Sequence, residues 1–209
     1  MTVRSVTTRA ARRPEARPAE IITAALELFA ERGFAATRLE DVASRAGLSK
    51  AAIYLYFKDK TALLKAVVEA AVGPRLEVAQ QLVGSHSGPV APLLAGLLAF
   101  FGQQLEHSRL PDIIKLVISE SRAHPELGRA YLDNVVMKAL PLFQSLIERG
   151  MASGEFRKVD ARLAVKCMVG PLLLGALWRS VFQPIGAEPL DIEALARQQA
   201  EIFLRGLQP

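Results

Sequence analysis

The segment SKAAIYLYFKDK, residues 49–60, concentrates side chains that donate hydrogen bonds to phosphate oxygens. On a helix that begins at Lys50, Ile53 and Phe57 lie one turn apart and share an inward face. Tyr54 then lies on the opposite, exposed side, together with Lys50. Exposing a tyrosine adds nothing to the stability of a small helical unit, but a phenol hydroxyl and an ammonium group are suitable phosphate donors. The spacing therefore predicts a face that binds phosphate groups.

Catalytic and metal chemistry have little support in the sequence. The single cysteine, Cys167, excludes an internal disulfide, and the three histidines do not have the spacing of metal ligands. We find no paired carboxylates, no nucleophile beside an evident base and no glycine-rich phosphate loop. We therefore expect no catalytic residues, no metal site and no cofactor, and we keep an all-helical enzyme as a second hypothesis.

Most of the net positive charge lies at the N-terminus. Residues 1–18 contain five arginines and one glutamate, a net of +4 within the total of +5 for the chain. We expect residues 1–17 to form a basic, flexible arm. Such an arm either approaches a polyanion such as DNA or is a solvated tail.

The sequence indicates a cytoplasmic protein without a membrane partner. The arginine-rich N-terminus lacks the apolar stretch of a secretory signal. The longest uncharged apolar run, residues 167–178, is shorter than the ~20 residues that cross a bilayer. We interpret this run as a buried helix.

Apolar residues recur with a period of 3.6 from Pro18 onward, which predicts an all-α protein. The first four helices have these boundary signals: Pro18 and Gly33 at the ends of the first, a Thr37–Glu40 capping box before the second, Gly47 and Ser49 in the turn before the third, and Asp59 before the fourth. Gly73 and Pro74 predict a kink in the fourth helix.

Five further helices complete the predicted architecture. A linker at 84–92 precedes the first of them, at about 93–107, and the second begins near Pro111. The third begins near Pro125, bends at Pro141 and runs to about Ser153. The last two cover about 160–182 and 191–205. We divide the chain into the arm (1–17), a helix-turn-helix domain (18–63) and a larger helical domain (64–209).

The stretch GFAATRLEDVASRAGLSKAAIYLYFKDKTALL, Gly33 to Leu64, resembles the DNA-binding signature of the TetR family of bacterial transcriptional regulators. The resemblance implies that the third helix enters the major groove of double-stranded DNA. It implies DNA contacts by the following residues: Thr37 and Arg38 at the start of the second helix, Ser49, Lys50 and Ala51 at the start of the third, and Tyr54, Tyr56 and Lys60 on the phosphate backbone. Ala51 and Ala52 depart from the Gly-Thr pair common in the family, which removes a hydroxyl from the reading face. Packing of the Tyr56 ring on the first helix is the alternative to a phosphate contact.

The same resemblance implies that residues 64–209 bind an effector and form a homodimer. Candidate effector contacts are Phe101, Gln104, Leu105, Ile114, Val117, Glu120, Tyr131, Met168, Leu172 and Trp178, and ordinary core packing is the alternative for the apolar members of this set. Candidate dimer contacts are Leu163, Leu174, Leu177, Leu195, Ile202 and Phe203, on the last two long helices. Burial inside the monomer is the alternative for the helix at 160–182.

The resulting functional hypothesis is a repressor that an effector releases from a palindromic operator. The mostly apolar central helices favour an apolar or amphipathic small molecule, because an unpaired charge buried there is costly. A shift of the fourth helix is the expected link between the effector and the DNA-binding domain. A binding protein with a degenerate DNA-binding module is a third hypothesis, and intact Ser49, Tyr54 and Lys60 argue against it.

Overall fold

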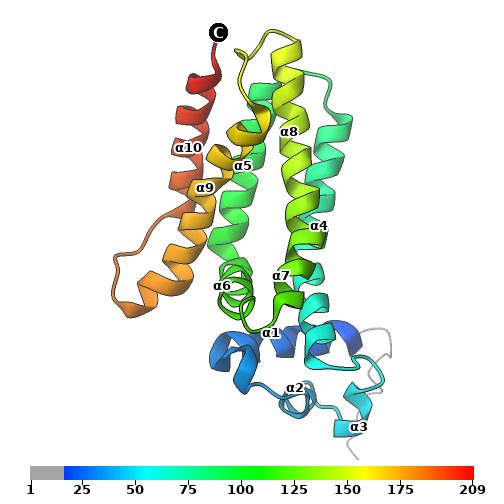
Figure 1. Ribbon diagram of the computed structural model, residues 1–209. Coiled ribbons are helices and arrows are strands. Elements are labelled where there is room, and N and C mark those ends of the chain that lie inside the picture. The colour runs from blue at the N-terminus through cyan, green and yellow to red at the C-terminus, as the bar shows by residue number, and fades with distance from the viewer. Residues whose placement is uncertain (1–16) are drawn as a thin grey trace, which may run out of the picture.

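The computed structural model describes residues 17–209, so the predicted arm lies outside the described residues except for Arg17. All regular elements within this range are helices, as the periodicity predicted. They are α1 (Arg17–Ala36), α2 (Leu39–Arg45), α3 (Lys50–Ile53), α4 (Lys60–Ser85), α5 (Val90–His107), α6 (Leu110–Glu120), α7 (Pro125–Tyr131), α8 (Met137–Ala152), α9 (Ala161–Leu177) and α10 (Ile192–Leu207). In Figure 1, α1–α3 form a small unit at one end, and α4, α5 and α8 extend away from it.

Three of the predicted boundary signals act as expected in the N-terminal unit. The Ser49 hydroxyl accepts a hydrogen bond from the Ala52 amide at 3.2 Å and caps α3. The Asp59 carboxylate accepts one from the Ala62 amide at 2.7 Å and caps α4. Gly47 has a φ of +67°, which glycine adopts without a steric penalty. These local interactions set the turn between α2 and α3.

The predicted Thr37–Glu40 capping box is wrong. The helix α2 begins one residue later than that box requires, with Arg38 as its N-cap, and the Arg38 amide donates to the Asp41 carboxylate at 3.1 Å. The Thr37 hydroxyl instead donates to the carbonyl oxygen of Gly33 at 2.8 Å. Thr37 follows the kink at Gly33 (φ 79°, ψ 165°), beyond which α1 continues to Ala36, so its hydroxyl fastens the end of α1.

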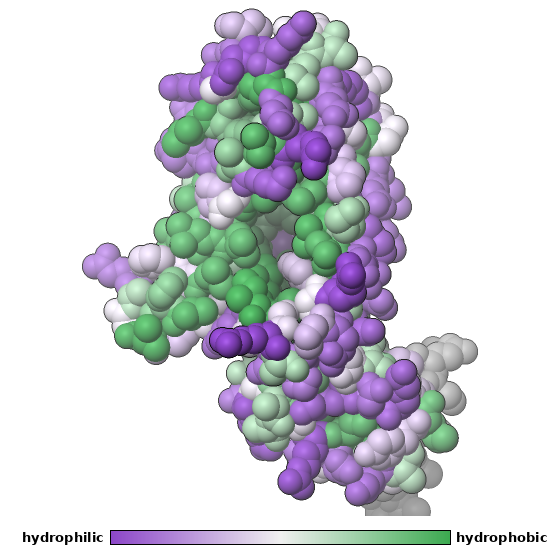
Figure 2. All heavy atoms as spheres, viewed as in Figure 1, coloured by the Kyte–Doolittle hydropathy of each residue, from purple (hydrophilic) through white to green (hydrophobic). Residues whose placement is uncertain are grey.

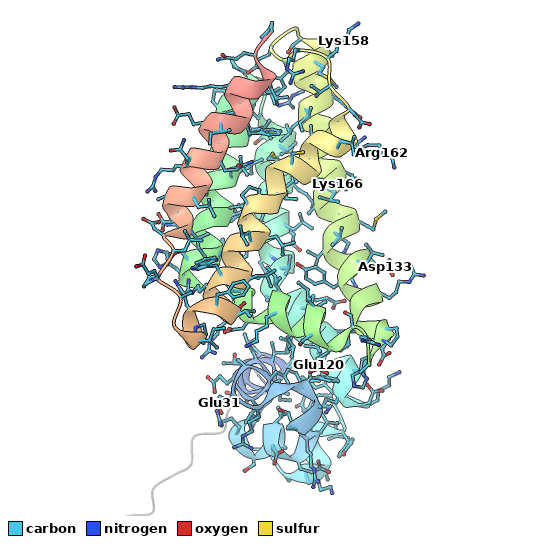
Figure 3. The ribbon with its side chains drawn as sticks, turned by 60° about the vertical axis from the view of Figure 1, so that its left-hand side comes forward. Glu31, Glu120, Asp133, Lys158, Arg162 and Lys166 are labelled. Atoms are coloured by element: carbon cyan, nitrogen blue, oxygen red, sulfur yellow. The ribbon has the colours of Figure 1, made fainter. Side chains whose placement is uncertain are left out.

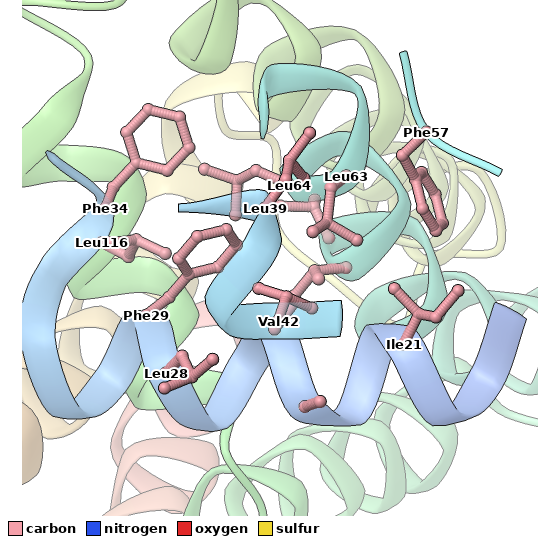
Figure 4. Close-up of a cluster of buried hydrophobic side chains, with 14 of the residues drawn as sticks. Ile21, Leu28, Phe29, Phe34, Leu39, Val42, Phe57, Leu63, Leu64 and Leu116 are labelled. Atoms are coloured by element: carbon pink, nitrogen blue, oxygen red, sulfur yellow. The ribbon is translucent and has the colours of Figure 1, made fainter. Parts of the chain in front are cut away.

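A first hydrophobic core joins the N-terminal unit to α6 and α7. Figure 4 shows its buried side chains on α1, α2, α4 and α6, among them Phe29, Val42, Leu64 and Leu116. Ile113 of α6 and Leu127 of α7 belong to the same core. The N-terminal unit is therefore packed directly on elements of the C-terminal part. A movement of α6 would change its packing against α1 and α4.

A second core lies among α5, α8, α9 and α10. The helix α4 reaches both cores, because Leu63 and Leu64 belong to the first and Ala79 to the second. It continues as one helix through Pro74. The predicted domain boundary between residues 63 and 64 falls inside this helix and stays a prediction.

Two irregular turns lie in the long C-terminal helices. A π-helical turn, Leu132–Val136, separates α7 from α8, so this irregularity precedes the predicted bend at Pro141, which lies inside α8. A second one, Trp178–Phe182, extends α9 and is followed by a 3₁₀ turn, Gln183–Ile185.

The continuous helical stretch Ala161–Ile185 is long and apolar enough to cross a membrane by length and composition, unlike the shorter run considered above. The core helix of a soluble protein passes the same test. Val165, Met168 and Leu172 of α9 are buried in the second core, which identifies one face of α9 as part of that core. Its other side carries exposed apolar side chains, among them Leu163 and Leu174.

Gly102 sets the distance between α5 and α10. A Cβ atom at this position would lie 2.5 Å from the Cβ of Ala196 and 3.3 Å from the carbonyl oxygen of Ile192. We therefore expect Gly102→Ala to lower the free energy of unfolding by about 1–3 kcal/mol, as overpacked core positions do. Gly96→Ala, on the same helix with open space around it, is the matched control and should raise it by up to ~1 kcal/mol. Denaturant unfolding of both variants measures the difference, and equal effects would contradict the close approach.

Candidate functional site

The predicted phosphate-binding face lies at the end of the molecule formed by α2 and α3. Helix α3 is short, and residues 54–56 continue it as a turn. Lys50 and Ala51 are exposed, and so are Tyr54 (46%), Leu55 (85%) and Tyr56 (40%). Ile53 and Phe57 are buried in the first core, as their spacing predicted. The exposed side of α3 therefore presents a lysine, two phenols and a leucine on a base fixed by the core.

Glu40 of α2 organises two of these side chains, a role the sequence analysis missed. Its Oε1 lies 2.9 Å from the Lys50 ammonium and accepts a hydrogen bond from the Tyr54 hydroxyl at 3.3 Å. The hydrogen bond from Lys50 lowers the pKa of the Glu40 carboxyl, and the same bond raises the pKa of the Lys50 ammonium. The carboxylate thus holds both donors together at the surface, where a phosphate could replace it as their acceptor.

Lys60 has a different environment from the one predicted for a free phosphate donor. Its ammonium donates to the carbonyl oxygens of Phe34 at 2.5 Å and Ala35 at 3.1 Å, and lies 4.3 Å from the centroid of the Phe34 ring. Partial burial lowers the pKa of this ammonium, whereas Glu120 raises it. Lys60 therefore satisfies carbonyl groups near the end of α1, and its third N–H has no acceptor among residues 17–209.

The other predicted DNA contacts differ in accessibility. Thr37 is 1% exposed, and its hydroxyl is engaged with backbone carbonyl groups, so the geometry favours a structural role. Arg38 is exposed at the start of α2. Ser49 is exposed, but its hydroxyl is used as the cap of α3. Of the predicted set, Arg38, Lys50, Ala51, Tyr54 and Tyr56 share an exposed surface.

Replacing Lys60 with glutamine should affect stability and DNA binding separately. The loss of a charged donor to two carbonyl groups should lower the free energy of unfolding by about 1 kcal/mol, after a discount for the partly exposed ammonium. If the third N–H binds a phosphate, the slope of log affinity against log salt should fall by about 2 for a dimer. Thermal unfolding and salt-dependent duplex binding measure the two effects, and an unchanged slope would restrict Lys60 to capping α1.

The predicted effector residues are divided between the two hydrophobic cores and the segment that follows α9. Leu105, Met168 and Leu172 are buried in the second core, and Val117 is buried in the first. Trp178 donates its indole N–H to the carbonyl oxygen of Glu188 at 2.9 Å, beyond the end of α9. These five residues have core or loop contacts of their own.

Glu120 and Tyr131 lie near the junction with the N-terminal unit. Figure 3 shows Glu120 between the helices of the C-terminal part and the N-terminal unit. Tyr131 is a partly buried side chain packed against the first core, and burial raises the pKa of its phenol.

Gln104 contacts Arg75, an arginine that the sequence did not single out. The Gln104 side-chain oxygen accepts a hydrogen bond from Arg75 Nε at 2.8 Å, joining α4 to α5. Phe101 and Ile114 are only partly buried although they pack against the second core. A signal was present in the sequence, because Arg75 interrupts the apolar stripe that includes Val72 and Ala79 on α4.

The surface of the C-terminal part is hollowed. Figure 2 shows an opening between the side formed by α9 and the side formed by α8, with hydrophobic surface on its borders. Apolar side chains that pack against the second core and remain partly accessible, such as Phe101 and Ile114, are consistent with an opening in this part of the molecule. This is where a small molecule could enter the helical bundle.

The predicted dimer residues lie on α9 and α10 and differ in exposure. Leu163, Leu174 and Ile202 are exposed by 59%, 53% and 61%, and Leu177, Leu195 and Phe203 are partly exposed. A shallow hollow of about 430 Å³ between the two helices is lined by Leu163, Cys167, Ile202 and Phe203, among others. Leu163, Ile202 and Phe203 thus share an apolar surface on two neighbouring helices, a feature typical of a protein–protein interface. We call these six predicted residues the outer α9/α10 face.

Comparison with known proteins gives two family matches that together cover most of the chain. The family described as bacterial regulatory proteins, tetR family, matches residues 21–67, and the tetracyclin repressor-like C-terminal domain matches residues 86–191. The first match contains the exposed face of α3, and the second contains α5 to α9.

Similar proteins extend over nearly the whole chain. The HTH-type transcriptional repressor KstR2 of Mycolicibacterium smegmatis is 24% identical over 196 residues, which cover 93% of this chain and 92% of that protein. The fatty acid metabolism regulator protein of Bacillus subtilis is 25% identical over 190 residues, covering 90% and 94%. The solved structure of the transcriptional regulator FadR from Bacillus subtilis in complex with stearoyl-CoA has a TM-score of 0.75 and 23% identity, over 91% of this chain and 99% of that chain.

The family matches, the helix-turn-helix geometry of α2 and α3 and the helical C-terminal part agree with one another. Relatives along the whole chain are named as regulators and not as enzymes. The chain therefore belongs to the TetR family of bacterial transcriptional regulators and is a non-enzymatic, DNA-binding protein.

Proposed function

We propose that this protein is a cytoplasmic, homodimeric repressor that an apolar or amphipathic small molecule releases from a palindromic operator. The observation that carries the proposal is the exposed face of α3, where Lys50 and Tyr54 both contact the Glu40 carboxylate. Two such faces related by a two-fold axis would read two half-sites about one helical turn of DNA apart, or a multiple of it. Binding would exchange the Glu40 carboxylate for DNA acceptors.

In this proposal Lys50 and Ala51 meet base edges at the start of α3. Tyr54 and Tyr56 donate to phosphates, and Arg38 approaches the backbone from α2. Phosphate contacts fix the orientation of the protein, whereas base-edge contacts carry sequence information. Leu55, the most exposed of these apolar side chains, is positioned beside the two phenols and adds an apolar surface to the same face.

The outer α9/α10 face supports the proposed dimer. In a dimer, α9 and α10 of one subunit would pair with those of the other and cover side chains that are exposed in the single chain. Only a third (33%) of the most apolar 18-residue window in Ala161–Ile185 is buried within the chain, as expected for a helix with one face in the core and the other in an interface.

The packing of α6 on the N-terminal unit supports a route from effector to DNA. Residues of α6 and α4 contribute to the first core together with α1 and α2, and α4 continues to Ala79 in the second core. An effector that moves α4 or α6 would therefore change the separation of the two α3 faces. By linkage, effector and DNA must weaken each other's binding by the same factor, typically 5–150-fold.

The acyl-CoA named in the FadR structure and the repressors among the relatives favour a hydrophobic effector and repression. The test is a titration of each effector found by screening, with the dimer free and bound to its operator duplex. The proposal predicts weaker effector binding in the presence of the operator. Equal affinities in both states would contradict ligand-controlled release.

A further inference from the structure

Arg75 is a charged side chain on the inward face of α4. Its neighbours on this face, Val72 and Ala79, are apolar, and Ala71 and Val72 pack against both hydrophobic cores. The arginine thus lies beside the seam between the two cores, with its side chain partly exposed. An inward position is unusual for an arginine unless a partner compensates its charge.

The contacts of Arg75 are to neutral groups. Its Nε donates to Gln104 at 2.8 Å, and Nη1 donates to the carbonyl oxygen of Ala71. No carboxylate among residues 17–209 forms an ion pair with it, and the neutral contacts leave both N–H groups of Nη2 without a protein partner in that range. Burial lowers the pKa of the guanidinium, because the charged form has lost part of its hydration. Its charge is therefore oriented by the protein but not neutralised.

Apolar side chains lie one helical turn before each member of this pair: Val72 precedes Arg75 on α4, and Phe101 precedes Gln104 on α5. Val72 of α4, Phe101 of α5 and Ile114 of α6 are partly buried and pack against the second core. Phe101 also contacts the ring of Phe143 of α8, with 5.8 Å between centroids. The hollow seen in Figure 2 opens into the same helical part of the molecule. A positively charged group beside apolar side chains is complementary to an amphipathic anion, which has a charged head and an apolar body.

We propose that the Arg75 guanidinium, oriented by Gln104, binds the oxyanion head of the effector, and that Val72, Phe101 and Ile114 contact its apolar body. The head is a carboxylate or a phosphate monoester, since both accept paired N–H bonds from arginine. This inference rests on the proposed function and names the chemical class of the effector. Because Arg75 lies on the helix that begins at Lys60, an anion bound there acts directly on the element that reaches the N-terminal unit.

The test is calorimetric titration of the full-length protein, without DNA, with straight-chain probes. The probes are hexanoate, decanoate and hexadecanoate, the alkyl phosphates of the same lengths, and the corresponding alcohols. The wild type should bind an anion at least about tenfold more tightly than the alcohol of equal length, as expected for a charged hydrogen-bond pair. Preference for carboxylates or for phosphates identifies the head group.

Variants assign the preference to Arg75. Arg75→Gln should remove the preference for anions and leave alcohol binding unchanged, and Arg75→Lys should keep part of it. Arg129→Gln, an exposed arginine on α7, is the matched control and should behave as the wild type. Arg75→Met serves as a second neutral variant if Arg75→Gln does not fold.

Three results would overturn the inference: equal binding of anions and alcohols, an anion preference that survives in Arg75→Gln, or no anion binding at any chain length. Operator binding is measured with the same proteins. Specific duplex binding that persists when the anion preference is absent would reject the anion site alone. Absence of specific duplex binding by the wild type would reject the proposed function without affecting the calorimetric result.

Discussion

Replacing Lys50 with alanine is expected to weaken binding of the dimer to its operator by about 30-fold to 10⁴-fold and to relax its preference at one base position in each half-site. One base-edge contact contributes about 1–3 kcal/mol to binding of the correct base. This free energy is counted twice, because each subunit contributes an α3. The Lys50 ammonium is exposed at the start of α3 and is held there by Glu40. Selection of bound sequences by wild type and variant measures both affinity and preference.

Glu40 complicates this comparison, because Lys50→Ala leaves its carboxylate facing the DNA with only Tyr54 as a partner. The double variant Lys50→Ala/Glu40→Gln removes that negative charge and separates repulsion from lost readout. Lys58→Ala is the matched control, since Lys58 is an exposed lysine of the same segment, 4.0 Å from Asp59. It should change affinity little and preference not at all. A uniform loss on all sequences in the Lys50 variants would make Lys50 a phosphate contact.

Introducing glutamates at Leu174 and Ile202 together is expected to convert the dimer to a monomer and to lower operator affinity by about 10²–10⁴-fold. Both side chains are more than half exposed on the outer α9/α10 face, so the charges should not disturb the fold of the single chain. In a dimer interface, however, two unpaired carboxylates per subunit would be buried next to those of the partner. The loss of affinity follows because two half-sites would no longer be bound by one linked molecule.

Light scattering measures the molecular mass of this variant, and circular dichroism verifies that it stays folded. Leu82→Glu is the matched control, because Leu82 is a leucine of similar exposure (45%) on α4. The control should remain dimeric and bind the operator as the wild type does. A dimer that survives both glutamates would place the subunit interface elsewhere and leave the apolar face of α9 without its proposed partner.

Features that depend on neighbouring residues were predictable from the sequence. The caps at Ser49, Asp59, Asp160 and Asp191 each form where the residue type and the following helix required them. The inward positions of Ile53 and Phe57 followed from helical periodicity. The all-α fold and its helix order followed from the same signals, which act within one turn of the chain.

Features that depend on distant parts of the chain were not predictable in the same way. Thr37 has the type and spacing of a cap, but the fold buries it, and its hydroxyl donates to the carbonyl oxygens of Gly33 and of Leu28, nine residues earlier. Lys60 belongs to the DNA-binding signature, yet the end of α1, about 25 residues earlier, supplies its acceptors. The bond between Arg75 and Gln104 joins two helices 29 positions apart. Helix propensity and hydrophobic periodicity describe residues within a few positions of one another, so they do not predict contacts between residues this far apart in the sequence.

The apolar candidates for the effector site illustrate the same limit of periodicity. Met168 and Phe101 both lie on inward faces of their helices, but Met168 is fully buried and Phe101 is only partly so. Periodicity identifies the face of a helix, whereas the space left between several helices depends on how they pack. Only the packed structure separates core residues from residues that border an opening.

The most direct measurement is selection of bound duplexes from fragmented bacterial genomic DNA by the purified protein at near-physiological salt, with Lys50→Ala/Tyr54→Ala as the control. The account predicts an enriched inverted repeat, with half-sites about one helical turn apart or a multiple of it, that the control no longer selects. No enriched sequence, or enrichment that is the same without these two side chains, would contradict the central claim that the exposed face of α3 reads DNA.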